Sequence, residues 1–290
     1  DRVVTTFVMS CGHCDICDDG RPYLCQTSLE SKARGELLAG GKRLSLNGKP
    51  INHAAGVSCF AEYAVVARET LVKLPDDLPL DDAALFGCAV MTGVGAVVNA
   101  AGVRPGQAVC VVGLGGVGYN AVMGAVIADA APIIAVDTNP AKFDLARDLG
   151  TTHCLDPRDG TALEQLRDLT GGGVRHAIES AGTVPALEFA YAALNAGGMV
   201  TSVGLTPSDA ALTLPPYDMV SKGKGVQGSY MGNCNPPTEI PRFIEYYRQG
   251  RLPLAKLLSG TLPLDDINEG FDRLAAGDAV RQILTPHGNN

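Results

Sequence analysis

The sequence has no tryptophan, and aromatic residues make up only 5% of it. Charged residues amount to 19%, acidic residues outnumber basic ones by 31 to 23, and lysine and arginine form no block. Proteins that bind nucleic acid through its phosphates carry clustered lysine and arginine. The composition therefore argues against a nucleic-acid partner.

Internal repeats, low-complexity tracts and flexible linkers are also absent, which excludes a solenoid or a disordered chain. The one stretch that we consider as a possible membrane span is residues 107–128, which carry no charge and have several glycines in their middle. A strand, a glycine turn and a buried helix explain this stretch better than a membrane span. The chain opens at Asp1 without the basic-then-apolar pattern of a signal peptide. We expect a cytoplasmic protein without a membrane partner.

The pattern of apolar residues changes twice along the chain. Short strand-like runs such as Phe60–Val66 and Leu71–Leu74 fill residues 1–89. Residues 90–230 alternate apolar runs with helical patterns, which is typical of βαβ units and a parallel sheet. We therefore predict an α/β fold with a Rossmann-type, doubly wound parallel sheet at 90–230. A second, β-rich domain is predicted from residues 1–89 and 231–290.

Individual elements follow from apolar periodicity. Strands are predicted at 108–113, 132–137, 153–155, 176–179, 199–204 and 226–231, with helices at 116–129 and 140–149. Further on, helices are predicted near 238–248 and 264–276, and a strand at 282–284. The run at 108–113 is apolar throughout, as expected for a central strand that is buried on both faces.

A glycine motif, Gly-Leu-Gly-Gly-Val-Gly at 113–118, lies between the first strand and first helix of the middle region. In this spacing Gly113 permits a sharp turn, Gly115 lets the backbone approach a pyrophosphate, and Gly118 allows close contact between helix and strand. The start of the helix offers free N–H groups to the phosphates. The motif predicts a dinucleotide site; a glycine-rich turn of another α/β fold is the alternative.

Asp137 ends the next predicted strand, nineteen positions after Gly118. A carboxylate there accepts hydrogen bonds from ribose hydroxyls and repels a 2′-phosphate, which favours NAD over NADP. Lys142 is a candidate for holding the ribose, although an exposed helix lysine is the ordinary interpretation.

Four of the nine cysteines, Cys11, Cys14, Cys17 and Cys25, fall within fifteen residues. Four thiolates on one short loop can surround a single zinc ion tetrahedrally, and the closed ligand set indicates a structural site. An iron–sulfur cluster or two local disulfides are the alternatives. His13 lies inside the loop and is expected to be exposed rather than coordinated.

Several motifs in order resemble the medium-chain zinc alcohol dehydrogenases, over nearly the whole chain. They are the cysteine spacing, Phe60–Val66, Gly87–Gly93 (Gly-Cys-Ala-Val-Met-Thr-Gly), the glycine turn, Ile267–Phe271 and Val280–Leu284. The branch it looks most similar to holds the larger alcohol dehydrogenases and the thiol-dependent formaldehyde dehydrogenases. The resemblance implies that the β-rich domain is a partial GroES-like catalytic domain.

The resemblance also implies roles for single residues. Cys88 matches a ligand of the catalytic zinc. Thr92 matches a residue whose hydroxyl lies beside the nicotinamide, and Val117 matches one whose side chain packs behind the nicotinamide ring. Val203 and Leu205 match the strand end over the nicotinamide and substrate, and Arg281 matches a residue that contacts the pyrophosphate. With Gly113, Gly115, Gly116, Gly118, Asp137 and Lys142 they form the expected cofactor and catalytic sites.

The expected catalytic zinc is incomplete in this sequence. A catalytic zinc needs three protein ligands and an open position. In the family the first Cys and His ligands precede the cysteine loop, and no segment here matches them. His53, His153, His176 and His287 fall outside that motif and are expected to be structural or surface residues. We therefore expect the sequence to lack an upstream segment.

The implied function is zinc-dependent transfer of hydride from an alcohol to NAD, reversibly, in a homodimer or homotetramer. Ala54 and Ala55 stand where the resemblance places larger pocket-lining residues, which suggests room for a bulky alcohol. A formaldehyde-thiol adduct is the alternative substrate. A zinc-free reductase and an inactive, truncated NAD-binding relative are the alternative functions.

Overall fold

The computed structural model describes residues 1–288 and divides into two compact units. The first unit contains Asp1–Cys88, Cys234–Tyr247 and the residues from Leu254 onward, and the second contains Ala89–Asn233 and Arg248–Pro253. The predicted assignment of residues 1–89 with 231–290, and of 90–230, to independently folding domains stays a prediction.

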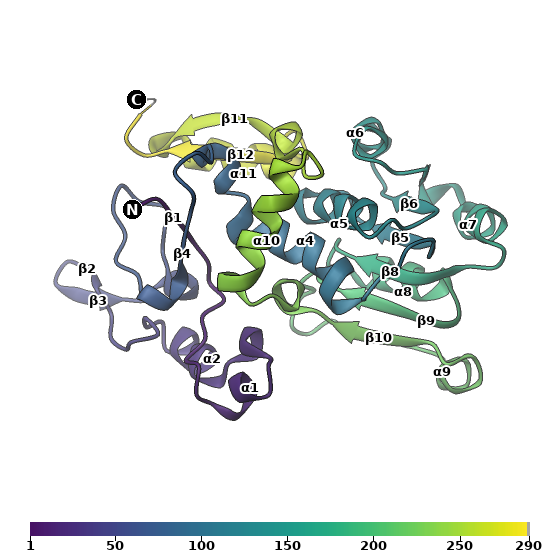
Figure 1. Ribbon diagram of the computed structural model, residues 1–290, viewed down its shortest axis with the longest axis horizontal. Coiled ribbons are helices and arrows are strands. Elements are labelled where there is room, and N and C mark those ends of the chain that lie inside the picture. Colours follow the sequence, from purple (N-terminus) through teal and green to yellow (C-terminus); the bar gives the residue numbers. More distant parts are fainter. Residues whose placement is uncertain (289–290) are drawn as a thin grey trace. The chain divides into compact units, whose positions relative to one another are not determined.

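A six-stranded parallel sheet forms the centre of the second unit, in the order β10-β9-β8-β5-β6-β7 (Figure 1). Its strands are β5 (Val109–Val112), β6 (Ile133–Val136), β7 (His153–Leu155), β8 (Val174–Glu179), β9 (Leu194–Ser202) and β10 (Gly225–Gly228). Strands β5 and β6 are buried at every position, as central parallel strands must be. The predicted α/β fold with a doubly wound parallel sheet is confirmed.

Helices α4 to α9 accompany this sheet. They are α4 (Met91–Gly95), α5 (Gly116–Ile127), α6 (Phe143–Asp148), α7 (Ala162–Thr170), α8 (Val184–Ala192) and α9 (Pro216–Lys222). Helix α5 packs closely against α4 because glycines stand at the contact. A Cβ on Gly93 would lie 2.4 Å from the carbonyl oxygen of Val117, and one on Gly124 would lie 3.0 Å from the Cα of Val94. Small residues at this contact let the backbones of α4 and α5 come close together.

Short strands in two-stranded sheets characterise the first unit. Its elements are β1 (Val3–Thr5), α1 (Asp15–Asp18), α2 (Gln26–Ala33), β2 (Leu44–Leu46), β3 (Lys49–Ile51), β4 (Leu71–Lys73), α3 (Leu80–Ala83), β11 (Leu258–Pro263), α11 (Ile267–Ala276), β12 (Arg281–Thr285) and most of α10 (Pro236–Arg248). Strands β1 and β4 pair antiparallel, and so do β2 and β3. The β2–β3 turn is Asn47-Gly48, both with positive φ, the backbone that a tight hairpin requires.

Three expectations about single elements are wrong. Phe60–Val66 has bends and irregular backbone rather than a strand, and no strand in the part of the chain that the structure describes pairs with it. A strand needs a neighbouring strand for its N–H and C=O groups, so a short strand-like run of apolar residues is not sufficient.

The strand predicted at 226–231 ends at Gly228, and Tyr230–Asn233 forms a 3-10 turn instead. Here the chain turns onto α4, since a Cβ on Gly232 would lie 2.1 Å from the carbonyl oxygen of Met91. The third error concerns long apolar stretches. Within residues 1–288 the helix that is long and apolar enough to span a membrane is Leu80–Ala100, which joins α3 and α4 through π-helical turns. It is 72% buried, as a core helix is.

Candidate nucleotide and zinc sites

The glycine turn brings β5 and α5 into direct contact. Gly113 has a φ of +94°, and a Cβ there would lie 2.7 Å from the amide nitrogen of Ala181. A Cβ on Gly118 would lie 1.8 Å from the carbonyl oxygen of Gly113. Any larger residue at either position forces the strand end and the helix start apart.

Gly115, between them, faces open space. A Cβ at this position would meet nothing within 4 Å, and the residue is exposed. It is also the N-cap of α5, and no side chain caps this end of the helix. The first N–H groups of α5 are therefore available to an anion, and the positive end of the helix dipole favours one.

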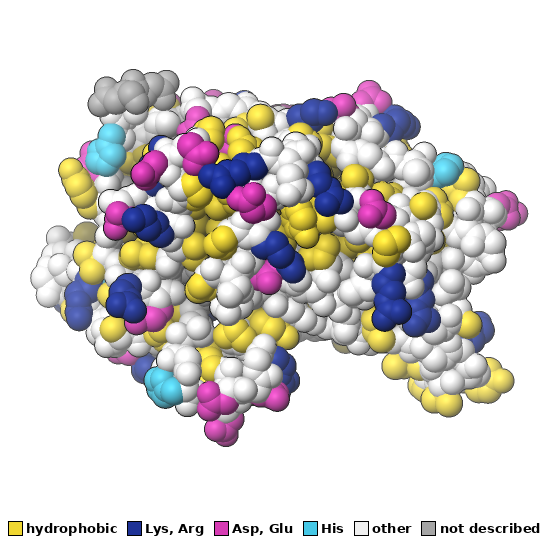
Figure 2. Space-filling model, in the orientation of Figure 1, with side chains coloured by type: hydrophobic (Ala, Val, Ile, Leu, Met, Phe, Trp, Pro, Cys, Tyr) yellow, Lys and Arg dark blue, Asp and Glu magenta, His cyan; other side chains and the backbone are white. Residues whose placement is uncertain are grey.

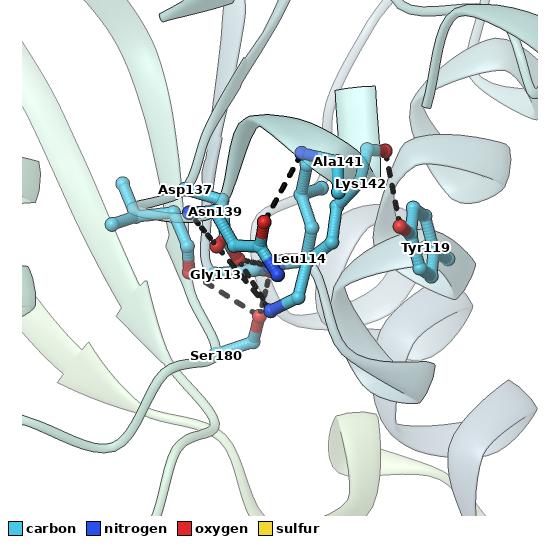
Figure 3. A network of polar contacts seen from close by, with 9 residues as sticks. Gly113, Leu114, Tyr119, Asp137, Asn139, Ala141, Lys142 and Ser180 are labelled. Carbon is cyan, nitrogen blue, oxygen red and sulfur yellow. Dashed lines mark hydrogen bonds and ion pairs between the residues drawn. The ribbon is translucent and has the colours of Figure 1, made fainter. Parts of the chain in front are cut away.

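Asp137 is the polar centre of the site, directly after β6 (Figure 3). The carboxylate is 8% exposed, and it accepts hydrogen bonds from the N–H groups of Leu114 (2.7 Å) and Asn139 (2.8 Å). The ammonium of Lys142 lies 3.0 Å from Oδ2 of the same carboxylate. Asp137 thus joins the glycine turn to the start of α6, which places its negative charge beside the turn.

Two hydroxyls complete the network in Figure 3. The Tyr119 hydroxyl donates to the carbonyl oxygen of Lys142 (3.0 Å), and that of Ser180 donates to the carbonyl oxygen of Gly113 (2.8 Å). Burial, together with the negative charge of Asp137, raises the pKa of Tyr119 to about 12, so this phenol stays protonated. The sequence analysis did not single out either residue.

A cleft of about 550 Å³ opens at the carboxyl ends of β5, β6 and β8. Its lining residues are Val112, Gly113, Val136, Asp137, Thr138, Pro157, Arg158, Ala181, Thr183, Pro185, Ala186 and Phe189. In open parallel sheets, ligands bind at the point where the strand order reverses, here between β5 and β8. The cleft is largely apolar and meets the carboxylate of Asp137 at one side, an arrangement that suits an adenosine moiety.

Arg158 lines this cleft and was missed in the sequence. Its guanidinium donates to both carboxylate oxygens of Asp156, and this contact holds the pKa of Asp156 below its ordinary value. The local signal was the Asp-Pro-Arg sequence after β7, because residues after the carboxyl ends of parallel strands gather at one edge of a sheet.

Thr92, Val203 and Leu205, the residues expected near the nicotinamide, all belong to the second unit. Thr92 is buried and its hydroxyl contacts the sulfur of Met231 (3.2 Å), while Leu205 is 88% exposed. Val203 follows β9, and its N–H donates to the carbonyl oxygen of Glu179 (2.9 Å). Val117 is half-buried in the first turn of α5. The cofactor-binding roles of these residues stay proposals.

The four clustered cysteines of the first unit, here called the cysteine loop (residues 11–25), bring their sulfur atoms within 4.8 Å of one another. The Sγ atoms of Cys14 and Cys17 are 3.5 Å apart, and those of Cys14 and Cys25 are 3.9 Å apart. Zinc–sulfur bonds of about 2.3 Å in a tetrahedron require sulfur separations of about 3.8 Å. Turns at Gly12 and Gly20, both with positive φ, let so short a segment close around one point.

Charge explains why this arrangement needs a cation. A hydrogen bond from Thr27 and the backbone near His13 lower the pKa of Cys11 to about 6, whereas burial raises the pKa of Cys17 to about 12. Four sulfurs so close together cannot all be thiolates unless a positive ion balances them. His13 is exposed, and its ring contacts the carbonyl oxygen of Cys11 (2.7 Å) rather than the sulfur cluster.

Cys88 is an exposed residue of the first unit. Across residues 1–288 the cysteine loop is the one group of three or more Cys, His, Asp or Glu side chains close enough to hold a metal, and Cys88 is not in it. Arg281, on β12, is half-buried in the first unit. Its predicted role at a pyrophosphate stays a prediction.

The histidines outside the loop occupy ordinary structural positions. His53 is buried, and its Nε2 accepts from the N–H of Arg43 (3.0 Å). His176 is also buried and contacts the side chain of Gln107 (3.0 Å); burial lowers its pKa. His153 and His287 contact Thr152 and the carbonyl oxygen of Glu62. None of them lies in a group that could hold a metal.

Comparison with known sequences points in one direction. The family profile described as "Zinc-binding dehydrogenase" matches residues 116–248. The chain is 36% identical over 289 residues to alcohol dehydrogenase class-P of Arabidopsis thaliana. The aligned segment covers 98% of this chain and 76% of the relative. It is also 36% identical over 287 residues to S-(hydroxymethyl)glutathione dehydrogenase of Escherichia coli, covering 98% and 78%.

Solved structures agree with the sequence relatives. An alcohol dehydrogenase zinc-binding domain protein from Burkholderia ambifaria superposes with a TM-score of 0.90 at 32% identity, covering 99% of this chain and 78% of its own. Benzyl alcohol dehydrogenase from Acinetobacter calcoaceticus superposes with a TM-score of 0.89 at 29% identity, covering 98% and 77%.

Proposed function

This chain belongs to the zinc-containing alcohol dehydrogenase family, and we propose that it transfers hydride reversibly between an alcohol and NAD. The observation that carries the proposal is the meeting of the glycine turn, the uncapped start of α5 and the carboxylate of Asp137 at one cleft. The glycine turn and the start of α5 suit the pyrophosphate, Asp137 suits the adenosine ribose, and the cleft suits the adenine.

NAD fits the residues that are present. We propose that Gly115 and the N–H groups at the start of α5 hold the pyrophosphate, with Gly113, Gly116 and Gly118 shaping the turn. Asp137 would accept from the adenosine ribose, with Lys142 beside it. Thr92, Val117, Val203 and Leu205 are proposed to enclose the nicotinamide, and Arg281 to reach the pyrophosphate. When bound, NAD supplies the carbon that accepts the hydride, and the protein supplies its position.

A structural zinc also fits. The sulfur separations in the cysteine loop suit a tetrahedral ion, and the loop leaves no position open for substrate. We propose that Cys11, Cys14, Cys17 and Cys25 bind one zinc ion that holds residues 11–25 in shape. The iron–sulfur and disulfide alternatives predict a coloured protein or oxidised thiols, respectively.

A complete catalytic zinc site does not fit the described residues, because no group of three or more Cys, His, Asp or Glu side chains among them includes Cys88. Cys88 is the ligand that we propose for such an ion.

The proposed substrate is a bulky primary alcohol. Ala54 and Ala55 are both exposed and offer only methyl groups where the family has larger side chains. The structural relative from Acinetobacter calcoaceticus acts on benzyl alcohol, as its name states. The S-(hydroxymethyl)glutathione dehydrogenase relatives support the alternative, a formaldehyde-thiol adduct.

We also propose that the protein assembles as a homodimer or homotetramer through β10. This strand is an edge of the six-stranded sheet, and an edge strand offers unpaired backbone groups to a second copy. Helix α9 precedes it and exposes Tyr217 and Val220, at 84% and 86%. Sedimentation equilibrium should give a multiple of the 30.1 kDa chain mass; a monomer would contradict the proposal.

Turnover is tested by supplying NAD with either benzyl alcohol or S-(hydroxymethyl)glutathione and following NADH formation. Faster reduction with benzyl alcohol supports the bulky-alcohol proposal, and the reverse order favours the thiol adduct. Binding of NADH without any reduction would identify an NAD-binding protein that lacks catalysis. Failure to bind NADH at all would contradict the proposal.

A further inference from the structure

Glu179 is a buried acidic residue that the proposed site does not yet use. It ends β8, is 0% exposed, and forms no salt bridge among residues 1–288. Burying a carboxyl group without a cation is costly, and hydrogen bonds only partly offset that cost. Its position therefore calls for an explanation other than stability.

Each carboxyl oxygen of Glu179 accepts a hydrogen bond from a different segment of the chain. Oε1 accepts a hydrogen bond from the N–H of Gly182 (2.6 Å), in the loop after β8. Oε2 accepts one from the hydroxyl of Ser202 (2.9 Å), the last residue of β9. The carbonyl oxygen of Glu179 accepts from the N–H groups of Val203 (2.9 Å) and Gly204 (3.2 Å). A single residue thus joins the loop after β8 to the loop after β9.

The two loops are packed backbone against backbone. A Cβ on Gly204 would lie 2.3 Å from the amide nitrogen of Gly182, and one on Gly182 would lie 2.8 Å from the carbonyl oxygen of Leu205. Gly182 and Gly204 therefore allow the short distance between the two loops, and the hydrogen bonds of Glu179 hold the loops in their relative position. The next residue, Ser180, bonds to the carbonyl oxygen of Gly113, so the end of β8 also ties these loops to the glycine turn.

We propose that Glu179 is a positioning residue for the nicotinamide half of the cofactor. It acts through the segment Val203–Leu205, which it holds in place, and touches no reacting atom. This inference rests on the proposed function, because that function places Val203 and Leu205 over the nicotinamide. The adenosine half is proposed to bind in the cleft beside Asp137, which Ala181 and Thr183 of the loop after β8 also line. The contact of Glu179 with Ser202, on the other loop, is therefore the one that acts on the nicotinamide side alone.

The two halves of the cofactor can be separated experimentally. NADH and ADP-ribose share the adenosine and pyrophosphate, and only NADH carries nicotinamide. In the Glu179→Gln variant the amide oxygen can still accept from the N–H of Gly182, but the amide nitrogen donates toward Ser202, whose hydroxyl must turn from donor to acceptor. The contact that holds the loop after β9 is therefore weakened, while the contact to the loop after β8 is kept. We expect NADH affinity to fall on the order of tenfold. ADP-ribose affinity should change less than about twofold.

NADH binding is followed by nicotinamide fluorescence, which no tryptophan obscures in this chain, and ADP-ribose binding by calorimetry. Glu188→Gln is the matched control, because Glu188 is an exposed residue of α8 in the same unit. Ser202→Ala removes one donor and leaves the carboxyl in place, which covers the case that Glu179→Gln fails to fold. It should weaken NADH in the same direction, and the double variant should lose less than the sum of the two effects.

Equal weakening of NADH and ADP-ribose would overturn the proposal, since it would show a general loss of structure. Unchanged NADH binding in both variants would overturn it as well. If the unmodified chain binds neither ligand, the proposed function itself fails, and that result is seen before any variant is made.

Discussion

Asp137 shows how one side chain can set the choice of cofactor. Its carboxyl group accepts hydrogen bonds from two backbone N–H groups and contacts the ammonium of Lys142, so it is held in place beside the glycine turn. A 2′-phosphate placed there would meet the charge of this carboxylate directly. The zinc-binding dehydrogenase from Sinorhizobium meliloti, a structural relative at 26% identity, was solved with NADP bound, so a related fold holds that cofactor.

Replacing Asp137 by Asn should shift the preference toward NADP. The amide keeps an acceptor for a backbone N–H but removes the negative charge and releases Lys142 to face a phosphate. We expect the ratio of NADPH to NADH affinity to rise about 10- to 100-fold, or about 1.4–2.8 kcal/mol. Fluorescence titration with each reduced cofactor measures it.

The control for this change is Asp144→Asn, which removes the same charge from an exposed ion pair with Arg147 on α6. Its affinity ratio should stay within about twofold of the unmodified chain, because exposed charges are well screened. An unchanged ratio in Asp137→Asn would show that another group selects the cofactor.

At the scale of the elements, Gly113 and Gly118 at the ends of the turn have a different role from Gly115 between them. Gly118→Ala would force a Cβ to within 1.8 Å of the Gly113 carbonyl oxygen, so α5 must move away from β5. We expect a loss of about 1–3 kcal/mol in the free energy of unfolding, measured in urea by circular dichroism. NADH binding should be lost with it.

Gly115→Ala is the matched comparison. Its backbone, with φ of −104°, suits alanine, and its Cβ would face open space. Stability should therefore change by less than about 1 kcal/mol. NADH affinity should nevertheless fall more than about tenfold, because the methyl group would stand where the pyrophosphate approaches. Normal NADH binding in Gly115→Ala would place the pyrophosphate elsewhere.

The elements also show how far sequence reasoning reaches. The glycine motif and Asp137 were visible because strand, turn and helix follow one another locally, and the cysteine loop because its ligands lie within fifteen residues. Glu179 and Ser180 were not visible, since their partners Ser202 and Gly113 lie at the ends of other strands, 23 and 67 positions away. Residues 60–66 were predicted wrongly because a strand-like run cannot by itself supply the neighbouring strand that it needs.

The formal net charge of the whole molecule is −8 at pH 7. On the face seen in Figure 2, acidic and basic side chains are interspersed. No basic patch invites a phosphate backbone on that face, in line with the composition. The cytoplasmic location expected from the sequence stays a prediction.

At the scale of the whole molecule, the zinc content tests how many zinc ions the chain binds. After dialysis against a mild chelator, elemental analysis should find about one zinc per chain, since only the cysteine loop forms a complete set of ligands among residues 1–288. Cys25→Ala should bring the value near zero, while Cys59→Ala, an exposed thiol outside the loop, should leave it near one. About two zinc ions per chain would mean that Cys88 finds further ligands and that a catalytic zinc is present after all. A value near zero in the unmodified chain, with iron present or the thiols oxidised, would instead remove the structural zinc and leave the nucleotide site as the main support for the proposed function.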